Sequence, residues 1–98
     1  LITTKFPKDE IYCLSTQMRR ASISIVSNLV EGLSRQSIKE KLRYIEVAYG
    51  STLELDIQLL LANDLGHIDQ TSLNEARDKI FILVKLLSGL RKSYLNKS

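Results

Sequence analysis

The chain has 98 residues, of which 44% are hydrophobic and 26% charged, and its formal net charge is +3. This length forms one domain, taken as residues 1–98, and the single cysteine excludes a disulfide within the chain. No segment reaches the roughly 18 consecutive apolar residues of a membrane span, and the first residues lack the basic start and apolar core of a secretory signal. We therefore expect a cytoplasmic protein with no membrane partner.

The first predicted helix covers residues 8–31. Pro7 precedes it, where the missing N–H costs nothing, and two acidic residues follow near the positive end of the helix dipole. Gly32 is a natural stop, because glycine adopts the left-handed conformation without strain. Apolar residues between these limits recur at spacings of three and four: Ile11, Leu14, Met18, Ala21 and Ile25. Residues 1–5 read as the tail of a preceding helix, so we expect one more helix before Leu1.

Two capping boxes open the second and third predicted helices, at residues 37–65 and 72–95. Ser37-x-x-Glu40 and Ser72-x-x-Glu75 each pair a hydroxyl with a carboxylate that can satisfy the free N–H groups of a helix start. Apolar residues from 53 to 61 spread around the second helix, which predicts burial on more than one side. The third helix carries a heptad pattern typical of helix bundles: Leu73, Ala76, Ile80, Leu83, Leu87, Leu90 and Tyr94.

These elements predict an all-α, antiparallel up-down helical bundle. No segment shows the alternating pattern of a strand, and the links at residues 32–36 and 66–71 are short. Short links force consecutive helices to run antiparallel. Three such helices are one short of a closed bundle, so we expect a four-helix bundle whose first helix is missing from this sequence.

The antiparallel order gathers basic residues at one end of the bundle, which we name the basic pole. The end of the first helix, the start of the second and the end of the third meet there. Clustered Lys and Arg attract phosphate backbones by releasing counterions, so we predict nucleic-acid contacts at this pole. Tyr44 and Tyr94 lie near it and are candidates for stacking on bases. A structural alternative stays open, because basic residues late in a helix also stabilise its negative end. The predicted nucleic-acid-binding residues are Arg35, Lys39, Lys41, Arg43, Arg91 and Lys92.

A polar stripe follows one side of the first helix and faces a glycine–serine pair in the second. A glycine inside a helix costs about 1 kcal/mol relative to alanine, so we expect Gly50 and Ser51 to receive the first helix at close range. Glu54, one turn further, would then pair with Arg19 or Arg20. Three interpretations stay open: a structural network within or between subunits, a ligand or nucleic-acid site, and a solvated face. The predicted network comprises Gln17, Arg19, Arg20, Ser24, Asn28, Glu31, Gly50, Ser51 and Glu54.

No residue pattern supports catalysis, a metal or a cofactor. His67 is the only histidine, and structural or catalytic metal sites need several ligands at suitable spacing. The glutamates of the second helix have no Glu-x-x-His partner, which excludes the usual di-iron arrangement. No glycine-rich phosphate loop or nucleophile–base pair is present. We therefore predict a protein that is not an enzyme.

Several short motifs occur together in residues 6–66. They are Phe6-Pro7-x-x-Glu10-x-Tyr12, Gln17-Met18-Arg19-Arg20-Ala21-x-x-Ser24-Ile25, Asn28-x-x-Glu31-Gly32-x-x-Arg35, Tyr44, Ala48-x-Gly50-Ser51, Glu54-Leu55 and Leu65-Gly66. Together they resemble the 23S rRNA intervening-sequence proteins, also called four-helix bundle proteins. The third predicted helix resembles that family only in its general character.

The resemblance implies a small bacterial four-helix bundle that assembles as a ring, commonly a homopentamer, with no established enzymatic activity. A related group serves as accessory subunits of diversity-generating retroelements, which implies contacts of the basic ring with nucleic acid. The family usually has a helix before the Phe-Pro pair. We therefore predict a homo-oligomer that binds RNA or DNA through its basic pole. The alternative is a protein-interaction scaffold that binds a protein partner and no nucleic acid.

Overall fold

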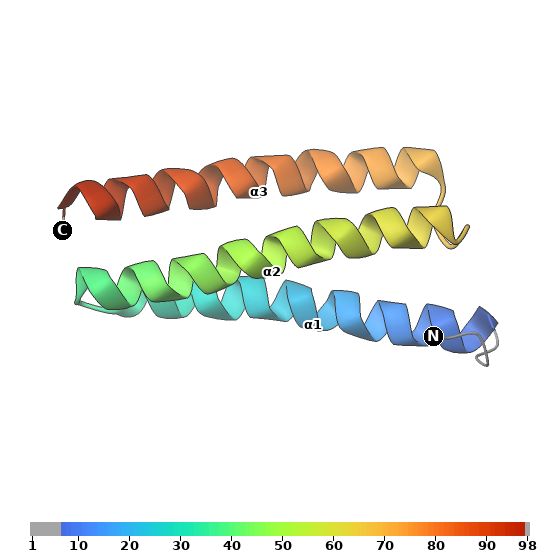
Figure 1. Ribbon diagram of the computed structural model, residues 1–98, viewed down its shortest axis with the longest axis horizontal. Helices are drawn as coiled ribbons and strands as arrows, with labels where there is room; N and C mark the ends of the chain where they lie inside the picture. The colour runs from blue at the N-terminus through green and yellow to red at the C-terminus, as the bar shows by residue number, and fades with distance from the viewer. Residues whose placement is uncertain (1–6, 98) are drawn as a thin grey trace.

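A computed structural model of the chain describes residues 7–97, which form three α-helices: α1 (Pro7–Ser34), α2 (Ile38–Asp64) and α3 (Gln70–Lys97) (Figure 1). No strand occurs in this part of the chain, so the predicted all-α class is confirmed. Residues 1–5, predicted as the tail of a preceding helix, and Phe6 of the Phe-Pro pair lie outside the described residues. The fourth helix therefore stays a prediction.

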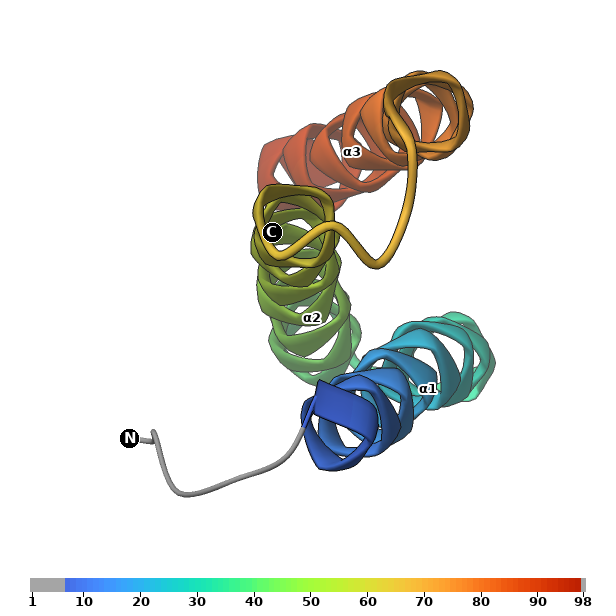
Figure 2. The same cartoon turned by 90° about the vertical axis from the view of Figure 1, so that its right-hand side faces the viewer.

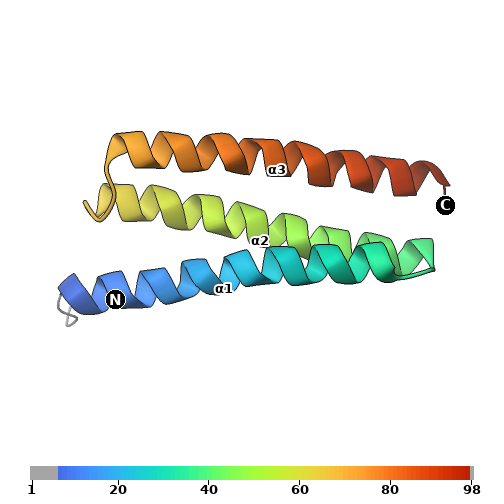
Figure 3. The same ribbon diagram turned by 180° about the vertical axis from the view of Figure 1, so that it is seen from behind.

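The three helices run antiparallel, and α2 is the central one. It packs against both α1 and α3, whereas the backbones of α1 and α3 are not neighbours over the described residues. Figure 2 shows the consequence: α1 and α3 lie toward the same side of α2 and leave that side of the molecule open. Seen from behind, the three rods lie side by side along nearly their whole length (Figure 3). The bundle is thus elongated, 49 × 25 × 18 Å, and not closed.

The core lies along the inner side of α2 in two clusters. Ile45, Ala48 and Leu87 form one, and Leu59, Leu73 and Ile80 form the other. The seam of α1 adds two buried residues at the predicted spacing, Ala21 and Ile25. The heptad of α3 supplies its buried residues at intervals of seven, because α3 has one partner and buries one narrow stripe.

The second helix is less enclosed than its composition predicted. Leu55, Leu59 and Leu60 pack toward the core, but Leu53, Ile57 and Leu61 are exposed. Burial on two sides is observed, because α2 packs against both α1 and α3, but within residues 7–97 it does not extend to Leu53, Ile57 and Leu61.

Two helix ends also differ from their predicted form. Gly32 does not end α1, which continues to Ser34. At the start of α3, Ser72 is not the capping residue, because the Asp69 carboxylate accepts the Ser72 backbone N–H at 2.7 Å. Hydrogen bonding from the Ser72 backbone N–H, and then from the Ser72 side chain, lowers the pKa of the Asp69 carboxyl below its usual range. The predicted cap of α2 is observed: the Ser37 hydroxyl accepts the Glu40 backbone N–H at 3.0 Å.

The open side of the bundle is an apolar groove floored by α2 and walled by α1 and α3. Its lining is Met18, Ser22, Leu55, Leu59, Ala76, Lys79, Ile80 and Leu83.

Within residues 7–97, no helix combines the length and apolar character needed to cross a membrane.

Candidate nucleic-acid interface and polar network

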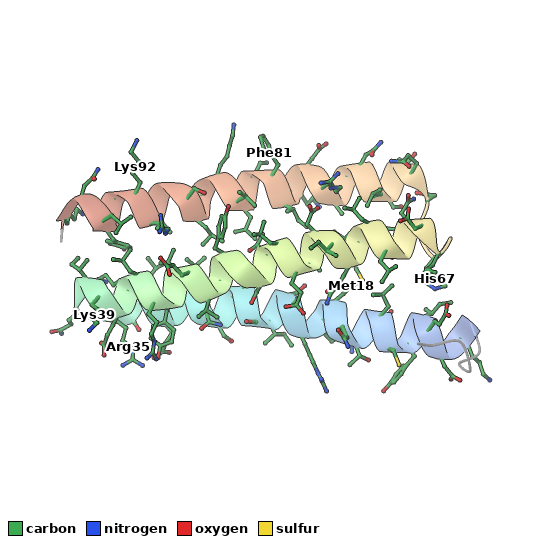
Figure 4. The ribbon with its side chains drawn as sticks, viewed as in Figure 1. Met18, Arg35, Lys39, His67, Phe81 and Lys92 are labelled. Carbon is green, nitrogen blue, oxygen red and sulfur yellow. The ribbon has the colours of Figure 1, made fainter. Side chains whose placement is uncertain are left out.

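The fold brings the six basic residues of the predicted interface to one end of the molecule. Arg35 follows the end of α1, three more lie in the first turns of α2, and two lie in the last turns of α3. Arg35, Lys39 and Lys92 mark this end in Figure 4, with side chains that point outward from three segments of the chain. The basic pole is therefore a feature of the folded chain as well as of the sequence.

Three of these six side chains already have partners within the chain. The Arg35 guanidinium donates to Glu31 at 2.6 Å and to the Tyr44 hydroxyl at 3.2 Å. Its interactions with Tyr44 and Glu31 raise the pKa of Arg35 above its ordinary value, so the charge is permanent. Lys41 Nζ donates to the Leu33 carbonyl at 3.2 Å and Arg91 Nε donates to Glu46 at 3.0 Å.

The remaining three are free of carboxylates. Lys39 and Lys92 are exposed and make no hydrogen bond or ion pair with the rest of residues 7–97. The Arg43 guanidinium lies 5.1 Å from the centre of the Tyr44 ring and is also exposed. A cation that has no acidic neighbour can contact a phosphate without first breaking an ion pair. These three side chains are the part of the predicted interface available to an anion.

Both tyrosines of the pole hold cations. Arg35 and Arg43 each lie 5.1 Å from the Tyr44 ring centre, and Lys41 and Lys97 lie 5.5 and 5.8 Å from that of Tyr94. The rings attract the cations through their quadrupoles, which keeps positive charge gathered at the pole. Their observed contacts are thus intramolecular, and of these only the contact of Lys41 with Tyr94 joins two helices.

The polar stripe of α1 forms part of the predicted network. The hydroxyls of Ser24 and Ser51 share a hydrogen bond of 2.8 Å across the two helices. Asn28 Nδ2 donates to the Ser24 carbonyl at 2.8 Å and to the Ser24 hydroxyl at 3.1 Å. One side-chain hydrogen bond, between Ser24 and Ser51, therefore joins α1 to α2, and Asn28 holds Ser24 from within α1.

The close approach of the helices occurs at a different glycine from the predicted one. A Cβ atom at Gly32 would lie 3.0 Å from the Tyr44 Cβ, so glycine lets α1 lie this close to α2 without a shift of Tyr44. A Cβ atom at Gly50 would meet nothing within 4 Å, and Gly50 is exposed. The prediction that Gly50 receives α1 is wrong. The reason is that Gly50 lies on the outer side of α2, whereas its neighbour Ser51 faces α1.

The charged members of the stripe do not pair as predicted. Glu54 accepts a hydrogen bond from Gln58 at 3.3 Å, and no ion pair joins it to Arg19 or Arg20 within residues 7–97. A polar hollow instead opens between α1 and α2, lined by Gln17, Arg20, Ala21, Ser24, Ser51 and Glu54. Glu31 pairs with Arg35, so the stripe is connected to the basic pole.

The opposite end holds acidic side chains and one contact that the sequence did not reveal. His67 Nε2 lies 3.9 Å from Glu10 Oε1, which links the loop after α2 to the start of α1. This pairing follows from the antiparallel order, because the first turn of α1 and the second loop share an end. Nowhere in the described part of the chain do three or more side chains of metal-binding type come together.

The fold and the basic pole together define an all-helical bundle protein. A match to the family described as 23S rRNA-intervening sequence protein extends over residues 1–89. The chain belongs to this family. None of the curated proteins compared with the chain matches it.

Proposed function

We propose that the chain is a non-enzymatic, oligomeric bundle protein that contacts RNA, or another nucleic acid, through its basic pole. The observation that carries this proposal is a group of exposed cations at one end that pair with no carboxylate of the described residues, among them Lys39, Arg43 and Lys92. The family name, with its reference to ribosomal RNA, favours RNA as the nucleic acid. Contacts from Lys and Arg to phosphates position a protein without reading bases, so the binding we propose is independent of sequence.

The proposed oligomer rests on the exposed apolar surface of the single chain. Large hydrophobic side chains are exposed on all three helices, including Tyr12, Ile57 and Ile82. Monomeric soluble proteins rarely expose contiguous apolar patches of large area. A homopentameric ring, which the family resemblance implies, would repeat the basic pole around an axis. Three phosphate contacts from each copy would then act together, and avidity would exceed the affinity of one copy.

The apolar groove supports a fourth helix. Its walls and floor present an apolar seam between α1 and α3, and one more amphipathic helix would bury this seam and close the bundle. We propose that the helix expected before the Phe-Pro pair packs there. The proposal is independent of the basic pole, because the groove and the exposed cations occupy different surfaces.

A charge-reversal experiment tests the nucleic-acid contact. In the variant Lys39→Glu with Lys92→Glu, we expect the affinity for a structured RNA at low salt to fall at least tenfold. The matched control is Lys8→Glu with Lys85→Glu, which changes the net charge equally away from the basic pole. Equal losses in both variants would reduce the effect to net charge and contradict a site at the pole.

A scaffold that binds only a protein partner is the second candidate. The exposed apolar side chains favour it as much as they favour self-association. In that case the wild-type chain would show no RNA or DNA affinity at low salt, and the charge-reversal pair would behave like the wild type.

A further inference from the structure

Two apolar stripes on the outside of the bundle are covered by no other helix within residues 7–97. On α1, Ile23, Val26 and Val30 follow at spacings of three and four and are 59–62% exposed. They lie on the side of α1 opposite Ala21 and Ile25, which pack against α2. We name this set the α1 stripe. It faces away from the core, so packing within residues 7–97 does not explain it.

The second stripe lies on the outer side of α2. Leu53, Ile57 and Leu61 are 43–65% exposed and continue the line that Gly50 begins. This side is opposite the buried Ala48, so it faces away from the open groove between α1 and α3. We name Gly50, Leu53, Ile57 and Leu61 the α2 stripe. The two stripes face different directions, because the α1 stripe lies opposite Ala21 and Ile25, which pack against α2, and the α2 stripe lies opposite Ala48.

Gly50 is the least expected member of the α2 stripe. A glycine inside a helix costs about 1 kcal/mol relative to alanine, and a Cβ atom at Gly50 would meet nothing within 4 Å in the described part of the chain. A hollow on the α3 side of Gly50 is lined by Glu46, Tyr49, Gly50, Ser88 and Arg91. Because glycine has no side chain, Gly50 leaves room within the exposed apolar stripe for a side chain of another molecule.

The register between α1 and α2 shows which side chain would meet Gly50 in a ring. Ser24 faces Ser51, and Gly32 faces Tyr44, so facing positions are fixed along the whole pair. Copies related by rotation about an axis along the helices lie at equal heights. Across such a contact, Val26 of one copy is level with Gly50 of the next. Ile23 is then level with Leu53.

We propose that the α1 stripe of one copy packs on the α2 stripe of the next, with Val26 seated against Gly50. The inference rests on the proposed oligomer and assigns its contact surfaces. Two different stripes make the contact heterologous, which repeats around a ring and leaves neither stripe exposed. A contact of the α2 stripe with itself would leave the α1 stripe uncovered.

Charge supports the same pairing. Arg19 is exposed beside the α1 stripe, and Glu54 is exposed beside the α2 stripe, and no ion pair joins them within one chain. In the proposed contact they lie within about one helical turn of each other, on opposite copies. The arrangement also places every basic pole at the same end of the ring, because rotation about the axis preserves direction.

The first test compares two glycines that have equally open surroundings. Gly50 and Gly89 both lie inside helices, and a Cβ atom at either would meet nothing within 4 Å. We expect Gly50→Leu to reduce the mass in solution to that of one chain, with the helical signal in circular dichroism retained. Gly89→Leu should keep the mass of the wild-type oligomer. An unchanged mass for Gly50→Leu would overturn the proposal.

A mixing experiment separates a heterologous contact from a self-paired one. One variant carries Val26→Asp with Val30→Asp, and the other carries Leu53→Asp with Ile57→Asp. We expect each alone to be a monomer and the equimolar mixture to form a heterodimer, joined by the two intact stripes. A dimer of the first variant alone would show that the α2 stripe pairs with itself and would contradict the proposal.

The RNA affinity of these variants keeps this inference separate from the proposed nucleic-acid contact. A monomeric Gly50→Leu chain should retain weak, salt-dependent binding through Lys39, Arg43 and Lys92, at least tenfold below the oligomer. An oligomer that forms as proposed but binds no RNA would contradict the nucleic-acid function and leave the assigned contact intact.

Discussion

The two helix pairs of this molecule are held by different means. Between α1 and α2, small and polar residues dominate: Gly32 admits Tyr44 at close range, and Ser24 shares a hydrogen bond with Ser51. Between α2 and α3, leucine-type packing dominates, and ion pairs lie outside it, with Arg77 bound to Asp56 at 2.8 and 3.0 Å. A pair built on small residues depends on shape, whereas a pair built on large apolar residues depends on buried area. Substitutions at the two pairs should therefore fail in different ways.

The largest effect should come from the α2–α3 pair at Leu87, which is fully buried. Leu87→Ala removes apolar contacts and leaves a cavity among Ile45 and Ala48, so we expect a loss of about 2–5 kcal/mol in the free energy of unfolding. Urea denaturation measures it. Leu86→Ala is the matched control, because Leu86 is exposed and should lose far less. Equal losses would contradict the assigned core.

The α1–α2 pair should fail by overpacking at Gly32. Gly32→Ala places a methyl group 3.0 Å from the Tyr44 Cβ, and we expect a net loss of about 1–2 kcal/mol after the gain in helix propensity. Gly89→Ala is the matched control and should gain up to about 1 kcal/mol, since its surroundings are open. Thermal unfolding of both variants is the measurement. A stabilised Gly32→Ala chain would mean that the helices do not approach closely there.

The smallest effect is expected at the start of α3, next to the loop that connects α2 and α3. Asp69→Ala removes the acceptor of the Ser72 N–H, so we expect a lower melting temperature at neutral pH. The folded-state pKa of Asp69 is below its unfolded value, so its contribution is present above the unfolded pKa and lost as the pH falls through the folded one. The difference from the wild type should therefore shrink in acid. Ser72→Ala, which keeps the backbone N–H, should change little, and a larger loss there would favour the serine cap.

The sequence revealed the helices and the basic pole, because both follow from local pattern and chain order. The three-four spacing of α1 and the heptad of α3 predicted the buried side chains Ala21, Ile25 and Leu87. Chain order alone was enough to bring Arg35 and Lys92 to one end. It was not enough to show that Arg35 and Arg91 are already paired, because their partners depend on the register of the helices.

Gly32 and Gly50 show what local pattern and chain order do not predict. Gly32 and Gly50 both lie inside helices, and only the point at which α1 crosses α2 decides which one is a contact. Sequence composition also predicted burial of Leu53 and Ile57, which the single chain leaves exposed. The apolar pattern of these residues fits the proposed contact, in which another copy covers them. The sequence contains the observed cap of α3 as Asp69-x-x-Ser72, which begins three residues before the predicted capping box Ser72-x-x-Glu75.

The salt dependence of RNA binding by the wild-type chain tests the central claim most directly. If the exposed cations of the basic pole contact phosphates around an oligomer, the logarithm of the affinity should fall linearly with the logarithm of the salt concentration, by about 0.9 for each phosphate neutralised on a duplex. We expect a slope of at least about 2.7, the value for three phosphates neutralised by Lys39, Arg43 and Lys92 of one copy. No affinity at low salt, or an affinity independent of salt, would contradict the account.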